Sequence, residues 1–245
     1  MKSKKTFLSI IIPLYNEERR IASLLKISEY LKSQKFTSEV LLVNDGSIDN
    51  TFLKLKKLIE NLPNKKNYKI ISYRENKGKG YAIKKGMLEA MGQYRLFTDI
   101  DLSTPINEFN NFLPLLKDYS IVIGSRKRKG AKLLKHQSEL REKLGKGFTK
   151  LSQLSLGLNL TDFTCGFKCF SSESAEAIFS RQKIERWGFD SEILFLAKKL
   201  HFSIKEVPVT WENDTETKVR LPQDIIISLS DLIKIRLNEF KKFYD

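Results

Sequence analysis

Five short runs of branched apolar residues, separated by segments with helical periodicity, constrain the fold of this chain most strongly. The runs are Leu8–Ile12, Val40–Val43, Lys69–Ser72, Tyr94–Thr98 and Ile121–Gly124. Strands rich in Ile, Val and Leu that alternate with helices are typical of a parallel sheet covered on both faces. The pattern therefore predicts an α/β fold with a Rossmann-like, mostly parallel central sheet.

The segments between and after these runs predict the remaining elements. Helical periodicity is found at Glu18–Lys32, Thr51–Asn61, Gly80–Met91, Ile106–Leu116, Glu139–Leu156, Ser172–Phe179 and Ser191–Leu200. Two more strands are expected at Phe167–Phe170 and Ile204–Thr210, and the basic stretch Arg126–His136 is the best loop candidate. We expect one domain over residues 1–221 and an amphipathic C-terminal helix within residues 222–245, over Asp224–Phe243.

Polar residues follow each of the first five predicted strands. These clusters are Pro13–Glu17, Asn44–Ser47, Arg74–Gly80, Asp99–Asp101 and Ser125–Arg126. In open α/β sheets, ligands bind outside the carboxyl ends of the strands. One such cluster is usually a helix cap or a turn, but five clusters on one rim favour a binding site.

The sequence Asp99-Ile100-Asp101 gives this rim its chemistry. Two carboxylates two positions apart in an extended segment point to the same side. Together they can hold one hard divalent cation, Mg²⁺ or Mn²⁺, which usually completes its shell with substrate phosphates. The pair indicates a site for a nucleoside diphosphate, although the pattern by itself also fits a solvated turn with two incidental acids.

Charge and cysteine usage narrow the classes of partner. The 44 Lys and Arg residues against 29 Asp and Glu give a net charge of +15, which favours an anionic partner. No basic stripe with interleaved aromatics marks a nucleic-acid module, and we expect no nucleic acid. Cys165 and Cys169 fit neither a disulfide framework nor a zinc signature, and they suggest a reducing compartment.

The ordered motifs resemble glycosyltransferase family two. They are PLYNEE, NDGS, NKGKGYAIKKG and TDIDLST, each after a predicted strand. In the second half, IVIGSR, TDFTCGFKCF, ERWGFDSEIL and VPVTWENDTETKVRL are similar to the dolichyl-phosphate glucosyltransferase branch. The resemblance implies a type A glycosyltransferase fold, with residues 1–221 as a single catalytic domain.

The same resemblance implies a reaction. It is the inverting transfer of a sugar from a nucleoside-diphosphate sugar to a polyprenyl or dolichyl phosphate. Glucose from UDP-glucose is the first expectation. GDP-mannose as the donor, or a hydroxyl acceptor in the synthesis of a cell-surface polysaccharide, remains the alternative.

The resemblance also implies roles for individual residues. Those expected to bind the nucleotide sugar are Pro13, Tyr15, Asn16, Glu17, Asp45, Lys79, Asp99, Ile100 and Asp101. Those expected to grip the acceptor phosphate are Arg126, Arg141, Lys168, Lys218 and Arg220. Catalytic roles are expected for Asp99, Asp101, Arg126, Arg141 and Asp190, while Asp190 fits a helix cap equally well. Lys143 and Lys146 are interpreted as solvated charges.

A lipid acceptor implies a membrane. We expect a cytoplasmic protein that associates peripherally with the cytoplasmic face of a membrane. The C-terminal helix combines residues such as Ile226, Ile233 and Leu237 with Lys234 and Arg236, and such a helix can lie on an anionic bilayer. Packing on the domain or on another subunit, or anchoring by a separate membrane protein, stays open at this point.

Overall fold

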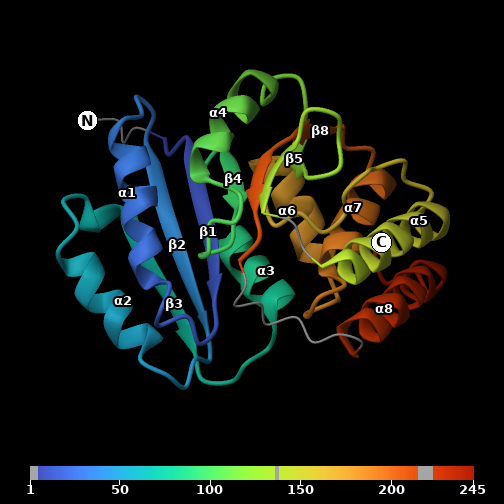
Figure 1. Cartoon of the computed structure of the whole chain (residues 1–245), viewed down its shortest axis with the longest axis horizontal. Helices are drawn as coiled ribbons and strands as arrows, with labels where there is room; N and C mark the ends of the chain where they lie inside the picture. The colour runs from blue at the N-terminus through green and yellow to red at the C-terminus, as the bar shows by residue number, and fades with distance from the viewer. Residues whose placement is uncertain (1–4, 136–137, 215–222) are drawn as a thin grey trace.

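The computed structural model describes residues 5–135, 138–214 and 223–245, and a seven-stranded sheet forms its centre (Figure 1). The strands are β1 (Leu8–Leu14), β2 (Ser38–Asp45), β3 (Tyr68–Tyr73), β4 (Tyr94–Phe97), β5 (Ile121–Ser125), β7 (Lys168–Ser171) and β8 (Ile204–Pro208). Their order is β3-β2-β1-β4-β7-β5-β8. Within this sheet β7 runs antiparallel to β4 and β5, and the other paired strands are parallel. The predicted mostly parallel α/β sheet is confirmed.

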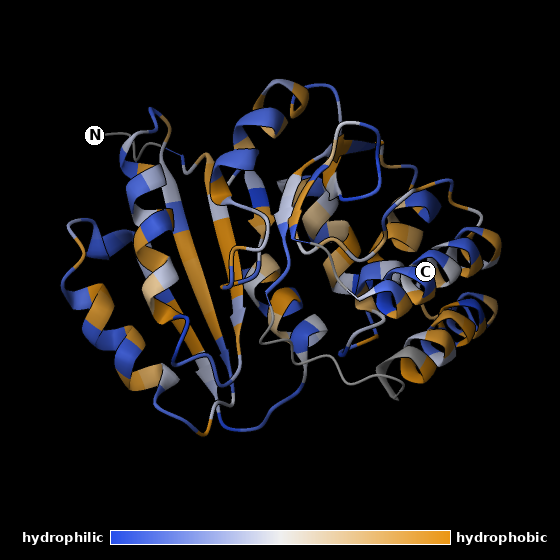
Figure 2. Cartoon of the chain, viewed as in Figure 1, coloured by the Kyte–Doolittle hydropathy of each residue, from blue (hydrophilic) through white to orange (hydrophobic). Residues whose placement is uncertain are grey.

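Helices cover both faces of the sheet. One face is covered by α1 (Leu24–Lys32), α2 (Thr51–Glu60) and the short α4 (Phe109–Phe112). The other face is covered by α3 (Lys79–Glu89), α5 (Glu139–Leu156), α6 (Ser172–Arg181), α7 (Phe189–Lys199) and α8 (Gln223–Phe240). The strands between them are strongly apolar, while the helices carry alternating apolar and polar bands (Figure 2).

The alternation of side chains along β1 explains why the protein has two cores. Ile10 and Ile12 pack in the core under α1 and α4, whereas Ile11 packs in the core under α3. Successive side chains of a strand point to opposite faces, so a strand that is apolar at every position needs cover on both. Each fully buried Ile contributes roughly 1.5–3 kcal/mol relative to an exposed one.

Two predicted helices are shorter than expected. The stretch from Glu18 reaches α-helical geometry only at Leu24, after a 3₁₀ turn at Ile21–Ser23. The predicted helix Ile106–Leu116 was wrong as a continuous helix, because α4 is flanked by 3₁₀ turns at Ile106–Glu108 and Leu113–Leu115. Pro114 lies in the second of these turns, and a proline has no amide hydrogen with which to continue an α-helix. A further 3₁₀ turn is Lys65–Asn67.

A second, two-stranded sheet corrects two other predictions. The basic stretch expected to be a loop contains β6 (Lys132–Lys135), which pairs in parallel with β9 (Thr210–Glu212). The single strand expected over Ile204–Thr210 is divided between β8 and β9. The pairing partner of β6 lies far along the chain, so local composition gave no sign of it.

The C-terminal segment packs onto the domain. On α8, Leu232 and Ile235 are buried among residues of the core under α3, α6 and α7, and α8 also contacts α5. Beyond α8, Tyr244 is fully buried and its hydroxyl donates a hydrogen bond of 2.6 Å to Glu192 Oε1. The division into a catalytic domain over residues 1–221 and a helix in residues 222–245 stays a prediction.

Candidate active site

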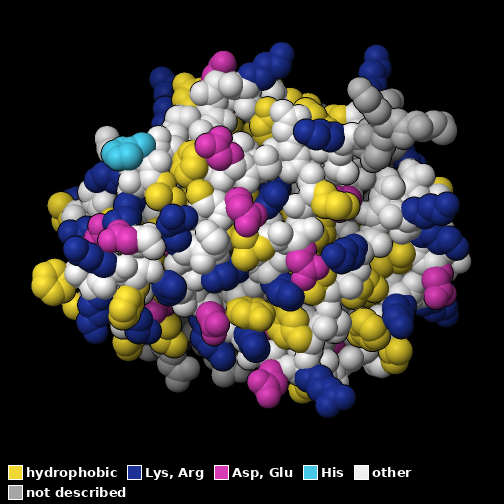
Figure 3. Space-filling view, turned by 180° about the vertical axis from the view of Figure 1, so that it is seen from behind, with side chains coloured by type: hydrophobic (Ala, Val, Ile, Leu, Met, Phe, Trp, Pro, Cys, Tyr) yellow, Lys and Arg dark blue, Asp and Glu magenta, His cyan; other side chains and the backbone are white. Residues whose placement is uncertain are grey.

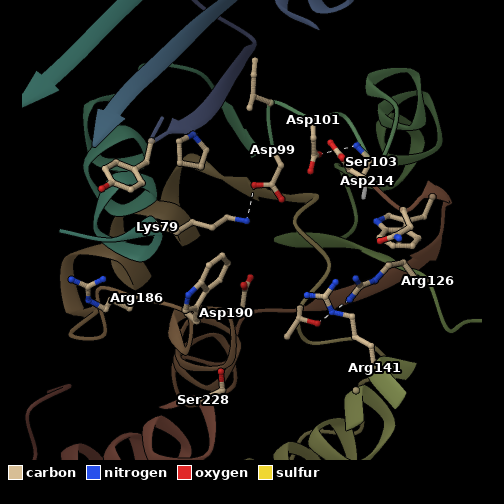
Figure 4. Close-up of a pocket in the computed structure, with 18 of the residues that line it drawn as sticks. Lys79, Asp99, Asp101, Ser103, Arg126, Arg141, Arg186, Asp190, Asp214 and Ser228 are labelled. Atoms are coloured by element: carbon tan, nitrogen blue, oxygen red, sulfur yellow. Dashed lines mark hydrogen bonds and ion pairs between the residues drawn. The ribbon is translucent and has the colours of Figure 1, made fainter. Parts of the chain in front are cut away.

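A pocket of about 1390 Å³ lies at the carboxyl ends of the parallel strands. Residues from all five predicted polar clusters line it, together with residues of α5, α7, β9 and α8. Of the predicted site residues, the lining includes Pro13, Tyr15, Asn16, Glu17, Asp45, Lys79, Asp99, Ile100, Asp101, Arg126, Arg141 and Asp190. The close-up shows acidic and basic side chains facing each other across this pocket (Figure 4).

The loop after β1 is held against the segment after β2. The amide of Asn16 donates to Ser47 Oγ at 2.9 Å, and Asn16 Oδ1 accepts from the amide of Ile48 at 2.9 Å. The amide of Glu17 donates to Thr51 Oγ1 at 2.7 Å. Asn16 has φ 51°, a left-handed conformation that asparagine tolerates better than most residues. These bonds fix the backbone of the Pro13–Glu17 cluster before a ligand arrives.

Asp45 organises the loop after β3. Its buried carboxylate accepts from the Asn76 side-chain amide at 2.8 Å, the Lys77 amide at 2.8 Å and the Gly78 amide at 2.9 Å. Gly78 has φ +108°, a conformation that side chains rarely allow. The carboxylate thus sets the start of α3 and the position of Lys79. Its expected contact with the nucleotide stays a prediction.

The two acidic residues after β4 lie in a turn. The strand ends at Phe97, and the amide of Leu102, at φ 51°, donates to the Asp99 carbonyl at 3.2 Å. The expectation of an extended backbone here was therefore wrong. Both carboxylates nevertheless line the pocket, and Asp101 Oδ1 accepts from the amide of Ser103 at 2.9 Å. Burial and the nearby Asp99 raise the pKa of Asp101.

Lys79 is paired with Asp99 at 2.6 Å between Nζ and Oδ1 (Figure 4). Burial works to lower the pKa of Lys79, but Asp99 and Asp190 raise it overall, so the ammonium is charged. Gly166 faces the Asp99 carboxylate so closely that a Cβ there would overlap Oδ2. Lys79 and the close backbone of Gly166 together fix the direction of the Asp99 side chain.

The donor chemistry of this acidic pair fits a hard divalent cation, which prefers carboxylate oxygens. Over the described ranges, no group of three His, Cys, Asp or Glu residues could hold a metal ion. A cation on Asp99 and Asp101 would therefore complete its shell with oxygens of a bound substrate and water.

Arg126 is held by Asp162. Its Nε donates to Asp162 Oδ2 at 2.7 Å and its Nη2 donates to Asp162 Oδ1 at 2.8 Å, while the guanidinium lies 5.5 Å from the ring centroid of Trp211. Although burial opposes the charged form of Asp162, Arg126 holds the pKa of that carboxyl well below its usual range. The arginine reaches the pocket as a fixed cation.

Arg141 enters the pocket from α5 and lies beside Arg126 (Figure 4). Lys127 and Lys146 also line this end. Lys146 is exposed at this edge of the pocket and Lys143 has a largely exposed side chain, as expected of solvated charges. Burial lowers the pKa of Lys127, whose Nζ donates to Thr149 Oγ1 and the Gly145 carbonyl. This half of the pocket has an excess of positive charge, with Glu142 as an acidic neighbour, and it lies opposite the acidic pair.

The structure places Lys168 elsewhere than expected. Its side chain is fully buried outside the pocket lining, and Nζ donates to the Asp190 carboxylate and, at 2.7 Å, to the Cys165 carbonyl. A lysine bound in this way cannot reach an acceptor phosphate. It instead holds Asp190, which lies in the first turn of α7 with no capping bond and faces the pocket. Burial raises the pKa of Asp190, and Lys168 and Lys79 oppose that rise.

Two predicted acceptor residues lie outside the described part of the chain, and three residues that were not predicted line the pocket. Lys218 and Arg220 lie outside the described residues. The lining also includes Trp187, Trp211 and Arg186, which the sequence reasoning did not assign. Lys79 Nζ lies 5.9 Å from the ring centroid of Trp187. Trp187 and Trp211 belong to the motifs ERWGFDSEIL and VPVTWENDTETKVRL. Their place in these motifs is the sequence signal that could have identified them as site residues.

The sequence and the fold are similar to those of known glycosyltransferases. The family described as Glycosyl transferase family 2 matches residues 9–179. A dolichyl-phosphate beta-glucosyltransferase of Dictyostelium discoideum is 36% identical over 242 residues, covering 94% of this chain and 74% of that protein. The proteins of the same description from Saccharomyces cerevisiae and Homo sapiens are each 32% identical, and each match covers 75% of the relative. These matches cover 96% and 94% of this chain.

Solved structures show the same fold. The glucosyl-3-phosphoglycerate synthase of Mycobacterium tuberculosis, in complex with Mn²⁺, uridine-diphosphate-glucose and glycerol 3-phosphate, superposes with a TM-score of 0.68 at 17% identity. That match covers 95% of this chain and 79% of the synthase. The same synthase in complex with Mg²⁺ and uridine-diphosphate gives a TM-score of 0.66, also at 17% identity. At this identity the likeness concerns the fold alone, which is of the type A class predicted above.

Proposed function

Because this chain belongs to glycosyltransferase family 2 and is a glycosyltransferase, we propose that it transfers glucose from UDP-glucose to a polyprenyl or dolichyl phosphate. The observation that carries this proposal is a pocket with an acidic end and a cationic end, in a chain 36% identical to a dolichyl-phosphate beta-glucosyltransferase. The acidic end suits the donor diphosphate with its metal, and the cationic end suits an acceptor phosphate.

The donor end is built from the loops after β1, β2 and β4. We assign Pro13, Tyr15, Asn16 and Glu17, with Ile100 of the acidic turn, to the walls around the nucleotide. Lys79 approaches the diphosphate from α3, where it already bonds to Asp99. Asp45 acts through the loop that it holds, which carries Lys79 at its end.

We assign Asp99 and Asp101 as the protein ligands of Mg²⁺ or Mn²⁺. When bound, such a cation neutralises charge on the departing diphosphate. Asp101 is bonded to the Ser103 amide through Oδ1, so the other oxygen of this carboxylate is available to a cation. Lys79 keeps the Asp99 carboxylate at the pocket in the absence of the donor.

The acceptor end needs to position a phosphate more than to activate it. A phosphate monoester is anionic near neutral pH, so one of its oxygens can attack the anomeric carbon without a strong base. The new carbon–oxygen bond forms as the bond to the diphosphate breaks on the opposite side, which inverts the configuration. Orientation of this kind contributes roughly 7–11 kcal/mol in good cases. Arg141 supplies a planar donor group that matches phosphate oxygens, and Arg126, whose Nε and Nη2 bond to Asp162, adds its fixed positive charge.

Asp190 faces the pocket between the two ends, and we assign it to a hydroxyl of the transferred sugar. Its pairing with buried Lys168 gives it a fixed position from which a carboxylate oxygen can accept a hydrogen bond. The same pairing disfavours a role as a free base, which supports a phosphate acceptor over a hydroxyl acceptor.

A lipid acceptor places the reaction at a membrane, and we propose peripheral association with the cytoplasmic face. Across the described ranges, no helix combines the length and the apolar character needed to cross a bilayer. Whether a partner protein contributes to the attachment is a separate question, which binding to protein-free vesicles decides.

The test is transfer from labelled nucleotide sugars to polyprenyl phosphate in detergent, with Mn²⁺ or with EDTA. Metal-dependent transfer of label from UDP-glucose to the lipid phase is expected, and Asp101→Asn should abolish it. If only GDP-mannose gave labelled lipid, the donor would be GDP-mannose and not UDP-glucose. Metal-dependent consumption of a donor with no labelled lipid would overturn the acceptor and leave the donor site standing.

A further inference from the structure

Two neighbouring helices of equal length each carry an exposed apolar stripe. On α5 the stripe is formed by Leu140, Leu144, Leu151 and Leu154, and on α8 by Ile226, Ile233, Leu237 and Phe240. These eight side chains are between 37% and 85% exposed. Isolated exposed apolar residues are ordinary, but two ordered stripes on adjacent helices are not.

The spacing of the two stripes is the same. Counting the small residues Gly147 and Ser230, each stripe advances by four, three, four and three residues, from Leu140 to Leu154 and from Ile226 to Phe240. Steps of three and four residues keep side chains on one face of an α-helix. Each helix therefore carries its exposed apolar side chains on one face, interrupted once by Gly147 or Ser230.

These stripes are not the faces that hold the helices to the domain. On α8 the buried Leu232 and Ile235 lie on the opposite side, against the core. On α5 the buried Ser152 and Leu156 lie opposite the exposed leucines. The two helices contact each other at one end of the molecule (Figure 1), and we call their two exposed stripes together the apolar ridge.

The apolar ridge lies next to the mouth of the pocket. Leu144 belongs to the ridge and also lines the pocket, and Ile227, next to the ridge residue Ile226 on α8, lines the pocket as well. Arg141, one turn from Leu144 on α5, points into the pocket beside Arg126 (Figure 4). A molecule with an anionic head in the pocket and an apolar chain would pass directly from the arginines onto the ridge.

The charges around the ridge match an anionic surface. Besides Arg141, α5 carries Lys143, Lys146 and Lys150 against the acidic Glu139 and Glu142. The chain as a whole has a net charge of +15. The opposite face of the molecule, seen in Figure 3, carries Lys and Arg side chains interspersed with acidic and apolar ones. An apolar surface bordered by cations is the combination that anionic lipid headgroups and acyl chains bind.

We propose that the apolar ridge of α5 and α8 docks this protein onto an anionic phospholipid bilayer, with the pocket mouth at the lipid surface. This assigns α5 an equal part with the C-terminal helix in membrane contact. The reason for a ridge beside the pocket rests on the proposed lipid-phosphate acceptor. The docking itself requires no acceptor and can be measured without one.

The experiment is co-sedimentation of the full chain with vesicles of phosphatidylcholine containing phosphatidylglycerol, without nucleotide or acceptor. The test variant combines Leu140→Ser, Leu154→Ser, Ile233→Ser and Phe240→Ser, all outside the pocket lining. The control variant combines Leu53→Ser and Met91→Ser, which are 65% and 75% exposed on other parts of the surface. Wild type and control are expected to bind, and the test variant to bind at least tenfold more weakly.

Transfer to a short, water-soluble prenyl phosphate gives the second measurement. The test variant should keep wild-type transfer to that acceptor, which shows that its pocket is intact. Equal vesicle binding by the test variant and wild type would overturn the proposal. So would wild-type binding only to vesicles that carry a membrane protein, or a dimer in solution that the test variant dissociates. Vesicle binding with no transfer to any lipid phosphate would refute the proposed function alone.

Discussion

Replacing Lys168 by methionine tests the role of the buried pair in depth. The change keeps an unbranched side chain of similar length and removes the ammonium. Lys168 is fully buried and Asp190 almost so, and Nζ also bonds to the Cys165 carbonyl and lies 5.4 Å from the ring centroid of Phe97. Water cannot reach the position of the fully buried Lys168 ammonium, so Asp190, whose side chain is about nine-tenths buried, would lose its cationic partner.

The expected loss of stability follows from the burial of the Lys168–Asp190 ion pair. Removing one partner of a buried ion pair costs about 3–5 kcal/mol, since the remaining charge stays uncompensated. For a chain of this size, 1 kcal/mol corresponds to about 2–4 °C in Tm. We therefore expect Lys168→Met to lower Tm by roughly 6–20 °C at neutral pH. Thermal unfolding followed by circular dichroism measures this directly.

The Tm difference between wild type and Lys168→Met should depend on pH, and the raised pKa of Asp190 sets the direction of that dependence. Burial raises the pKa of Asp190 even with Lys168 present, and loss of the cation raises it further. A carboxyl with a raised pKa in the folded state favours folding most below its ordinary pKa of about 4 and loses that contribution as pH rises. The Tm difference between wild type and Lys168→Met should therefore shrink as pH falls.

A second substitution separates the charge from simple packing. Asp190→Asn in the Lys168→Met background removes the orphan charge and should recover part of the lost Tm. Lys79, which also lies near Asp190, is unchanged in both variants and serves as the constant background. A double variant less stable than the single one, or a Tm loss independent of pH, would refute the reasoning.

Three further predictions concern the pocket and the C-terminal segment. Asp101→Asn should abolish metal-dependent binding of UDP, measured by calorimetry with Mn²⁺ and with EDTA; unchanged binding would remove Asp101 from the metal site. Arg141→Ala should keep donor binding within about twofold and lower transfer to lipid phosphate by at least 100-fold, or about 2.7 kcal/mol, since a charge-assisted bond is lost; equal losses of both would contradict an acceptor role. Tyr244→Phe should cost about 1–3 kcal/mol in urea unfolding, because Glu192 loses a buried donor at 2.6 Å; a stability equal to wild type would show that this bond contributes nothing.

The parts of the fold that local sequence dictates were predictable. The continuous apolar runs identified the parallel strands, and the helix Glu139–Leu156 has the bounds that its periodicity predicts. The site rim was also predictable, since residues after parallel strands meet at one edge regardless of the details of packing. Twelve residues assigned to the site line the pocket for this reason.

The parts decided by distant contacts were not predictable. Lys168 was expected to grip the acceptor phosphate, yet its neighbours Asp190 and Phe97 come from other elements and hold it in the core. The strand β6 exists because β9 pairs with it from far along the chain. The turn at Asp99 follows from one backbone bond to Leu102, which periodicity does not reveal.

The place of β7 in the sheet has a consequence for the order in which the chain folds. β4 and β5 are consecutive in the sequence, but β7 lies between them and pairs with both. Until Lys168–Ser171 leaves the ribosome, each of the two strands has an open edge of unpaired backbone groups, which are prone to wrong pairing. The β3-β2-β1-β4 half can assemble early from parallel neighbours, whereas the other half must wait for a late strand. Synthesis that pauses before residue 171 would therefore leave a nascent chain most exposed to aggregation.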